Sequence, residues 1–224
     1  MSNVLDVSRP SAHVARVWLN RPDVRNAFND DVIAALTATF TELSKDEDLR
    51  VVVLGAHGKA FCAGADLNWM KAMAGYSWEE NRADAQKLAD MLWTLDQCPV
   101  PVVGRVQGDC YAGGMGLAAI CDVLVAVEGA TFCLSEARLG LLPATISPYV
   151  ARALGVQASR RYMVTAERFS AARSETGDAA VDWEMLMGEN GPQVEPPREG
   201  GIGSGAADDA RWRRQLGCRG KYLT

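Results

Sequence analysis

The sequence predicts an α/β fold, and three observations lead to that class. Short runs rich in β-branched residues alternate along the chain with longer segments whose apolar residues recur at helical spacing. Alternation of this kind is typical of a sheet whose strands are connected through helices. The sequence has no clear internal repeat and no heptad pattern, which argues against repeat architectures and coiled coils. Its 224 residues, 48% of them hydrophobic, are enough to bury one sizeable core.

Four strands are expected from runs of β-branched and other apolar residues. They cover HVARVWLN (13–20), VVVLG (51–55), VPVVGRVQG (100–108) and VLVAV (123–127). A helix is expected between the first two runs, where apolar residues recur at three- and four-residue steps. Its apolar stripe consists of Ile33, Leu36, Phe40 and Leu43, with Asn29 or Asp30 as the N-cap.

A second helix is expected after the second strand. Ser77 and Glu80 have the spacing of a capping box, in which each side chain bonds the other residue's main-chain N–H. The apolar residues that follow at helical spacing are Leu88, Met91, Leu92 and Leu95, and Pro99 lies just beyond the end of the segment. Both helices are interpreted as scaffold.

Charge and residue composition limit the classes of partner that we expect for this protein. The formal net charge of −5 and the pI of about 5.1 provide no general attraction to nucleic acid or to anionic membranes, so neither is expected as a partner. The six cysteines show no CxxC spacing and fit a reducing compartment, and neither a signal peptide nor a membrane span is visible, so a cytoplasmic protein is expected. His13 and His57 lack acidic or cysteine partners, so no metal site is expected.

The composition changes near Ser174. Residues 174–224 are rich in Pro, Gly and charge and have few periodic apolar residues. We therefore divide the chain into a core at 1–173 and an atypical tail at 174–224, which we expect to be largely disordered. The alternative is a partner-binding tail anchored by Trp212.

Two turns built from small residues are the candidate functional segments. The first reads GKAFCAGADL after the second expected strand, and the other reads GDCYAGGMGL after the third. Each runs into an expected helix, whose first N–H groups have no partner within the helix. Two such turns facing each other could hold an oxygen that becomes negative during a reaction, and small residues would let the substrate approach the main chain. Plain tight turns or a phosphate cradle are the alternatives, although neither turn matches a P-loop or a GxGxxG motif.

Three longer segments resemble one enzyme superfamily. GKAFCAGADLNWM, VQGDCYAGGMGLAAICDVLVA and FCLSEARLGLLPATISPYV are similar, in order and spacing, to the crotonase or enoyl-CoA hydratase/isomerase superfamily, and the resemblance covers residues 4 to 173. It implies a spiral of ββα units that binds an acyl-CoA thioester, with coenzyme A as part of the substrate and no separate cofactor. The segments DLNWMKAM, YSWEEN and SEARLGLLPATISPYV further resemble the methylglutaconyl-CoA hydratases of leucine breakdown, and relatives that act on branched glutaconyl-CoA analogues in terpenoid degradation.

The resemblance also implies the site. The N–H groups of Ala65 and Gly113 match the two donors that bind the thioester oxygen, and Glu136 in LSEARLG matches one of the family's two catalytic glutamates. The positions that match the substrate and coenzyme A pocket are Arg25, Ala27, Ala63, Asp66, Leu67 and Gly114. Apolar neighbours would raise the pKa of Glu136 if it is buried. Gly116 stands at the position of the other glutamate and cannot transfer a proton.

Three functional interpretations remain. Glu136 alone could orient water and deliver a proton to C2 of a 2-enoyl thioester, which makes the chain a hydratase, and the family details favour this interpretation. It could instead move a proton between C2 and C4, as in a Δ3,Δ2-enoyl-CoA isomerase. Because the tail replaces the helices that build the homotrimer or hexamer of the family, assembly and activity stay open, and a non-catalytic acyl-CoA-binding relic is the third interpretation.

Two polar residues beside these motifs have both a structural and a functional interpretation. Asp109 is either a local turn residue, which we favour, or a substitute acid. Arg138, two residues after Glu136, could contact a second carboxylate on the substrate.

Overall fold

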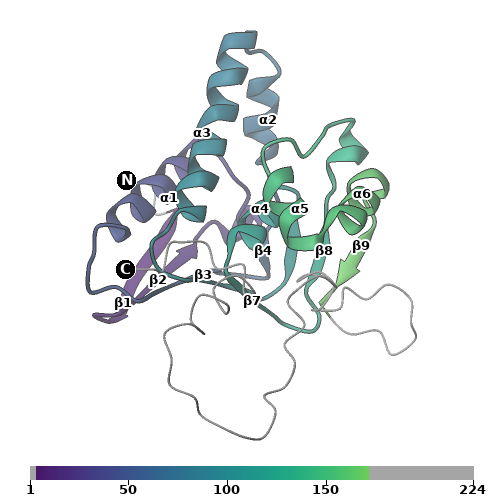
Figure 1. Ribbon diagram of the computed structural model, residues 1–224. Helices are drawn as coiled ribbons and strands as arrows, with labels where there is room; N and C mark the ends of the chain where they lie inside the picture. Colours follow the sequence, from purple (N-terminus) through teal and green to yellow (C-terminus); the bar gives the residue numbers. More distant parts are fainter. Residues whose placement is uncertain (1–3, 172–224) are drawn as a thin grey trace, which may run out of the picture.

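The computed structural model describes residues 4–171, which form two sheets with helices packed against them (Figure 1). The larger sheet has the strand order β1-β2-β3-β5-β7. Its strands are β1 (Leu5–Ser11), β2 (Val14–Leu19), β3 (Val51–Ala56), β5 (Val102–Val106) and β7 (Val123–Ala126). Strand β1 is antiparallel to β2, whereas β2, β3, β5 and β7 are mutually parallel. Each parallel connection contains at least one helix, as parallel pairing requires.

The smaller sheet continues from the ends of the parallel strands. It has the order β4-β6-β8-β9. Its strands have three residues each: β4 (Ala60–Cys62), β6 (Asp109–Tyr111), β8 (Thr131–Cys133) and β9 (Arg168–Ser170). The first three are parallel, and β9 is antiparallel to β8. This sheet carries the chain from each long strand to the turn that follows it.

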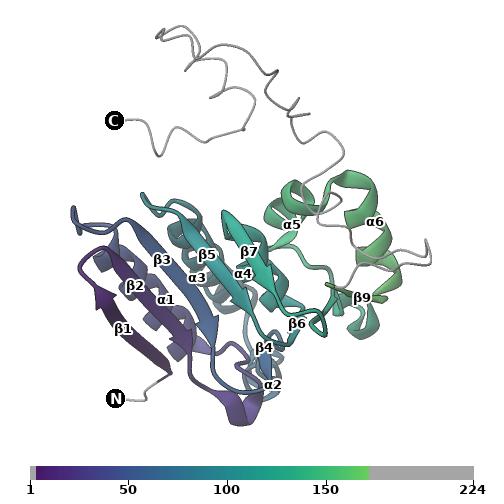
Figure 2. The same ribbon diagram turned by 90° about the horizontal axis from the view of Figure 1, so that it is seen from below.

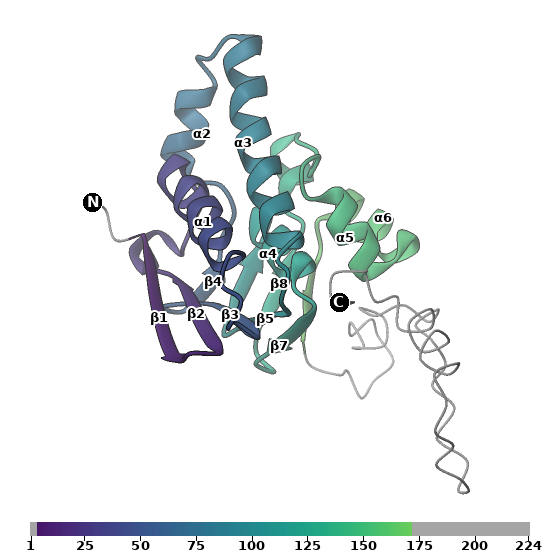
Figure 3. The ribbon, with the colours of Figure 1, turned by 60° about the vertical axis from the view of Figure 1, so that its left-hand side comes forward.

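Helices connect the strands of the two sheets. They are α1 (Asp30–Leu43), α2 (Leu67–Met73), α3 (Trp78–Asp96), α4 (Gly113–Ile120), α5 (Ser147–Leu154) and α6 (Val156–Thr165), with short 3₁₀ turns η1 (Pro22–Val24) and η2 (Glu136–Leu139). Figure 2 shows the five strands side by side with α1, α3 and α4 behind them. In Figure 3, α2 and the first half of α3 extend away from the sheets.

The expected helices are confirmed together with their caps. All four residues of the α1 stripe are buried in the core, and the Asn29 side chain accepts a hydrogen bond from Val32 N at 3.1 Å. The capping box of α3 is complete, because Ser77 N donates to Glu80 Oε2 and Glu80 N donates to Ser77 Oγ. Met91, Leu92 and Leu95 are fully buried. The local patterns therefore fixed both helices correctly.

The sequence patterns missed β1 and the whole smaller sheet. Strand β1 has only one buried residue, Leu5, and it contains Pro10, so its alternation of apolar and polar residues ends after Val7. The strands of the smaller sheet are too short to show a period of two, and they are extended because neighbouring strands hold them. The tail at 174–224 lies outside the described residues. Among the residues that are described, none of the helices combines the length and apolar character of a membrane span.

Candidate active site

The first small-residue turn follows β4 and leads into α2. Phe28 lies beside it in a parallel bridge with Ala65. Phe28 N donates to Gly64 O at 2.7 Å, and Asp66 N donates to Phe28 O at 2.8 Å. The main chain is therefore held on both sides of Ala65, and Gly64 supplies the left-handed conformation, with φ of 94°.

The second small-residue turn follows β6 and leads into α4. Ala112 has φ 46° and ψ −120°, a conformation that a residue with a side chain rarely adopts. The structure supports it through a hydrogen bond from Ala112 N to Cys133 O at 2.8 Å, next to the pairing of β6 with β8. Backbone strain of this kind costs about 1 to 3 kcal/mol and is concentrated at functional sites. Here it sets the direction of the next peptide group, which carries Gly113 N.

The two turns touch each other, and this contact explains the glycines. A Cβ on Gly64 would lie 2.7 Å from Ala112 Cβ and 3.5 Å from Gly113 N, while one on Gly114 would lie 2.5 Å from Cys62 O. Within the described chain, the N–H groups of Ala65 and Gly113 donate to no acceptor. Two unpaired main-chain donors thus come from turns in direct contact, which is the arrangement that an oxyanion site needs.

Glu136 is the predicted proton carrier. It begins η2, three residues after Cys133, whose carbonyl holds the second turn. Its carboxylate is partly buried, and Oε2 has no hydrogen-bond partner. Burial raises the pKa of Glu136 above its usual range, against a smaller opposing effect of its own main-chain N–H. A partly buried carboxylate with one unpaired oxygen is suited to exchange a proton with a substrate.

The raised pKa predicts a pH-dependent stability difference for Glu136→Gln. A raised pKa means that the folded state binds the proton more tightly, so stability is highest below the unfolded pKa of about 4.3 and falls as pH rises through the folded value. At pH 7 we expect the variant to be more stable than the parent, with Tm higher by about 2 to 4 °C for each kcal/mol gained. Near pH 4 the difference should disappear. Thermal unfolding at both pH values measures it, and a variant less stable than the parent at pH 7 would contradict the argument.

Gly116, the position that the resemblance matches to a second glutamate, lies inside α4, and the space beside it is already filled. A Cβ at this position would lie 2.4 Å from Ile146 Cγ2 and 3.5 Å from Leu92 Cδ2. Ile146 is itself buried. A glutamate side chain at position 116 would therefore require Ile146 to move. With glycine there, Glu136 has no second carboxylate from this position of α4.

This close packing predicts that Gly116→Ala destabilises the protein. Overpacking a filled core site costs about 1 to 3 kcal/mol, which should lower Tm by about 2 to 4 °C per kcal/mol. Adding Ile146→Ala removes the Cγ2 that the new methyl meets. The double variant should then lose less stability than the sum of the two single variants, and simple additivity in thermal unfolding would show that the two positions do not compete for space.

The residues matched to the coenzyme A pocket lie around the first turn. Arg25 is exposed on the turn after η1, and its carbonyl accepts from Ala63 N at 3.0 Å. Ala27 is buried, whereas Leu67 at the start of α2 is 69% exposed. Asp66 is buried, and both of its carboxylate oxygens are bonded within the protein. The structure thus gathers these residues, while their roles toward a substrate stay predictions.

Two polar residues near the motifs are engaged elsewhere. Asp109 lies on β6 and accepts a hydrogen bond from Thr131 Oγ1 at 2.6 Å, which links it to Tyr111 on the same strand. Arg138 Nη2 donates to Ala166 O, the C-cap carbonyl of α6, at 2.6 Å. Asp109 is therefore structural, but as a strand residue that bonds β8 and not as the turn residue expected from the sequence. The contact of Arg138 directs its side chain toward α6.

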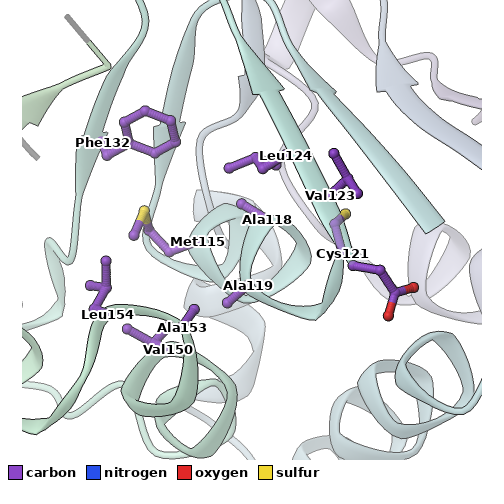
Figure 4. A pocket seen from close by; sticks show the side chains of 11 residues that line it. Met115, Ala118, Ala119, Cys121, Val123, Leu124, Phe132, Val150, Ala153 and Leu154 are labelled. Atoms are coloured by element: carbon purple, nitrogen blue, oxygen red, sulfur yellow. The ribbon is translucent and has the colours of Figure 1, made fainter. Parts of the chain in front are cut away.

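A cavity of about 210 Å³ begins beside the second turn, where Met115 contributes to its lining. Figure 4 shows the side chains that line it. It lies between α4, β7 and α5, and its lining is apolar apart from Asp122. The Asp122 carboxylate accepts from Val102 N, which ties the start of β7 to β5. None of the residues matched to the catalytic or substrate site lines this cavity, so we do not assign the reaction to it.

Sequence reasoning missed three residues that shape the site. Arg21 and Asn26 hold the turn before Phe28 through hydrogen bonds. The ring of Phe28 packs against Gly113, so that a Cβ on Gly113 would lie 2.7 Å from Phe28 Cε2. Arg21 and Asn26 stand in the segment NRPDVRN, whose polar residues around Pro22 look like those of an ordinary surface turn. Asn26 is 1% exposed, and this burial could not be read from the sequence.

Comparison with known proteins decides the family. The enoyl-CoA hydratase/isomerase family model matches residues 9–177. The chain belongs to this family. Its α/β fold is therefore the crotonase-like fold, as the motifs around the two turns indicated. Members of the enoyl-CoA hydratase/isomerase family are also found among solved structures: an enoyl-CoA hydratase from Shewanella pealeana is 44% identical, has a TM-score of 0.73, and matches over 75% of this chain and 63% of that one.

Curated relatives include both reaction types. Enoyl-CoA hydratase AKT6-1 of Alternaria alternata is 37% identical over 161 residues, which are 70% of this chain and 51% of the relative. The mitochondrial Delta(3,5)-Delta(2,4)-dienoyl-CoA isomerase of Mus musculus is 34% identical over 148 residues, which are 61% of this chain and 44% of the relative. The chain thus spans about half the length of these curated relatives.

Proposed function

We propose that the protein binds an acyl-CoA thioester and adds water across the C2–C3 double bond of a 2-enoyl group. The observation that carries this proposal is the contact between two turns whose N–H groups, at Ala65 and Gly113, have no acceptor within the described chain. A thioester oxygen placed between them would accept both hydrogen bonds. Because these donors are fixed before the reaction, they stabilise the negative charge that develops on this oxygen.

Glu136 supplies the proton transfer in this scheme. In its ionised form the carboxylate accepts a hydrogen bond from water and takes a proton as the hydroxide bonds to C3. The C2–C3 π electrons move toward the thioester, whose oxygen becomes an enolate oxygen between the two N–H groups. Glu136 then returns the proton to C2, the carbonyl re-forms, and the carboxylate is regenerated. One water is added, and no other proton carrier is needed.

For the acyl group we propose 3-methylglutaconyl-CoA or a related branched glutaconyl-CoA. The support is the resemblance of DLNWM and LLPATISPYV to hydratases of that kind, together with glycine at position 116. Arg25 is exposed beside the first turn, and a guanidinium there with no side-chain partner among the described residues supports a role in binding the phosphates of coenzyme A. The contact of Arg138 with α6 gives no support to a role for that residue in binding a substrate carboxylate.

A Δ3,Δ2-enoyl-CoA isomerase is the second candidate. Isomerisation requires one group that removes a proton from C4 and returns it to C2, and the single carboxylate Glu136 suffices for it. The filled space at Gly116 favours any reaction that works with one acid. The similarity to a dienoyl-CoA isomerase also supports this candidate.

One assay separates these functions. The full chain is incubated with 3-methylglutaconyl-CoA, crotonyl-CoA and a 3-enoyl-CoA, and the products are separated by liquid chromatography and identified by mass. A hydratase adds the mass of one water to the 2-enoyl substrates, whereas an isomerase converts the 3-enoyl substrate without a change in mass. Binding of all three thioesters with no turnover would replace both proposals by a non-catalytic acyl-CoA-binding protein.

A further inference from the structure

The guanidinium group of Arg21 joins two segments that lie on either side of the first turn. Arg21 Nη1 donates to Ala27 O at 2.6 Å, and Arg21 Nη2 donates to Asp66 Oδ2 at 2.9 Å. The Arg21 side chain is 21% exposed and that of Asp66 is 11% exposed, so the ion pair is largely shielded from water. Charge-assisted hydrogen bonds in such surroundings hold geometry more firmly than those at the surface.

These two acceptors enclose the peptide that carries the proposed oxyanion donor. Ala27 precedes Phe28, and Asp66 follows Ala65. Phe28 is in turn bonded to the residues before and after Ala65, as described above. The guanidinium therefore closes a ring of hydrogen bonds around the Phe28–Ala65 bridge. A shift of the Ala65–Asp66 segment relative to Phe28 would therefore act on the hydrogen bonds of Arg21.

The main chain of Arg21 is itself held by hydrogen bonds to Asn26. Its N–H donates to Asn26 Oδ1 at 2.8 Å, and its carbonyl accepts from Asn26 N at 2.8 Å. The buried Asn26 amide also donates to His57 O and Ala60 O, which ties this turn to the start of β4. Asn26 holds a left-handed conformation, with φ of 56°, that asparagine tolerates better than most residues. The ring of bonds is thus anchored in the core of the fold.

Both oxygens of the Asp66 carboxylate already accept hydrogen bonds within the protein. Its Oδ1 accepts from Asn68 N at 2.9 Å as the N-cap of α2, and its Oδ2 accepts from Arg21. Burial alone would raise the pKa of Asp66, but the Asn68 N–H and the Arg21 charge together lower it below its ordinary value. The carboxylate therefore stays ionised and paired, and its effect on bound thioester passes through the main chain of the turn.

We propose that Arg21 is a positioning residue that, through Asp66 and Ala27, holds the Ala65 N–H where the thioester oxygen becomes negative. This inference rests on the proposed function and adds the residue that fixes one of its two donors. Misplacing a donor weakens transition-state binding more than ground-state binding. The expected signature is thus a loss in kcat with little change in the affinity for coenzyme A thioesters.

Arg21→Met tests the proposal, because methionine keeps much of the apolar stem and removes both hydrogen bonds. We expect kcat for enoyl-CoA hydration to fall about 10- to 100-fold, in line with the effect of small displacements at a reacting centre, while the Kd for the substrate changes less than threefold. Arg21→Lys retains the charge but not the planar pair of donors, so it should restore only part of the rate. Arg16→Met, on an exposed residue of β2, is the matched control and should leave both constants unchanged.

A double-mutant cycle with Asp66→Asn identifies the route of the effect. Asparagine can still cap α2, so this variant should lose less kcat than Arg21→Met, and the double variant should lose no more than Arg21→Met alone. Additive losses, or an unchanged kcat in Arg21→Met that folds with the parent's Tm, would overturn the proposal. If Arg21→Met does not fold, Arg21→Lys and Asp66→Asn are judged by the same criterion, a lowered kcat at unchanged Kd.

Amide hydrogen exchange distinguishes failure of this inference from failure of the proposed function. If the parent turns over no enoyl-CoA, the proposed function fails, and the positioning role is then judged on exchange alone. In Arg21→Met, or in Arg21→Lys if that variant is the one that folds, the amides of Phe28 and Asp66 should exchange faster than in the parent, and those of α1 should not. Unchanged exchange at Phe28 and Asp66 would show that the turn keeps its place without the guanidinium.

Discussion

Glu136→Gln is expected to abolish nearly all turnover of enoyl-CoA while leaving the binding of the thioester in place. Glutamine keeps the shape of the side chain and removes the group that takes and returns a proton. General acid–base catalysis contributes about two to four decades of rate, so kcat should fall by about that factor. The Kd should change little, because the two main-chain donors and the exposed surface around Arg25 remain. Single-turnover rates and calorimetric Kd values for the same thioester measure the two effects separately.

Asp109→Asn is the matched control for that experiment. Asp109 is the other acid considered from the sequence, and its Oδ1 accepts from Thr131, a bond that asparagine can preserve. This variant should keep most of the parent's turnover. Normal hydration by Glu136→Gln together with inactive Asp109→Asn would transfer the proton-carrying role to Asp109 and contradict the assignment made here.

Gly113→Pro is expected to reduce turnover by two to three decades through the loss of one oxyanion donor. Removal of a single donor of this kind costs about 10²- to 10³-fold in kcat. Gly113 is the first residue of α4, a helix position at which proline is tolerated because its N–H has no partner within the helix. The substitution therefore removes the donor without breaking the helix.

A Cβ at this position also has a steric cost, which Gly113→Ala isolates. The new atom would lie 2.7 Å from Phe28 Cε2 in either variant, so the ring must turn in both. Alanine retains the N–H, and the ratio of kcat between the alanine and proline variants reports the donor alone. Equal turnover in the two folded variants would remove Gly113 from the oxyanion site, whatever their common loss relative to the parent.

The parts of the fold that the sequence predicted are those fixed by local patterns. The α1 stripe and its Asn29 cap depend on residues three or four positions apart, and the Ser77–Glu80 box does too. The strands of the smaller sheet escaped prediction because three residues cannot display a period. They are extended only because distant segments align beside them, as Cys62 does with Cys110.

For the site, the sequence predicted the small residues and the glutamate. It did not predict the backbone conformation and packing around them. Gly64 and Gly113 stand out because runs without side chains are unusual next to a helix start. The conformation of Ala112 could not be foreseen, since alanine gives no sign of a positive φ. Nor could the filling of the space at Gly116, because Ile146 lies thirty residues further along the chain and meets α4 only after folding.

The carbonyl of Cys133 that holds Ala112 has a consequence for the order in which the protein folds. The donors at Ala65 and Gly113 and the supporting groups at Arg21 and Cys133 come from segments far apart in the chain, so closing them together requires long loops to form first. During synthesis from the amino terminus, the second donor cannot acquire its support before β8 has left the ribosome. Nascent chains that end before β8 should therefore already form α1 and its cap, yet they should be unable to retain an acyl-CoA thioester.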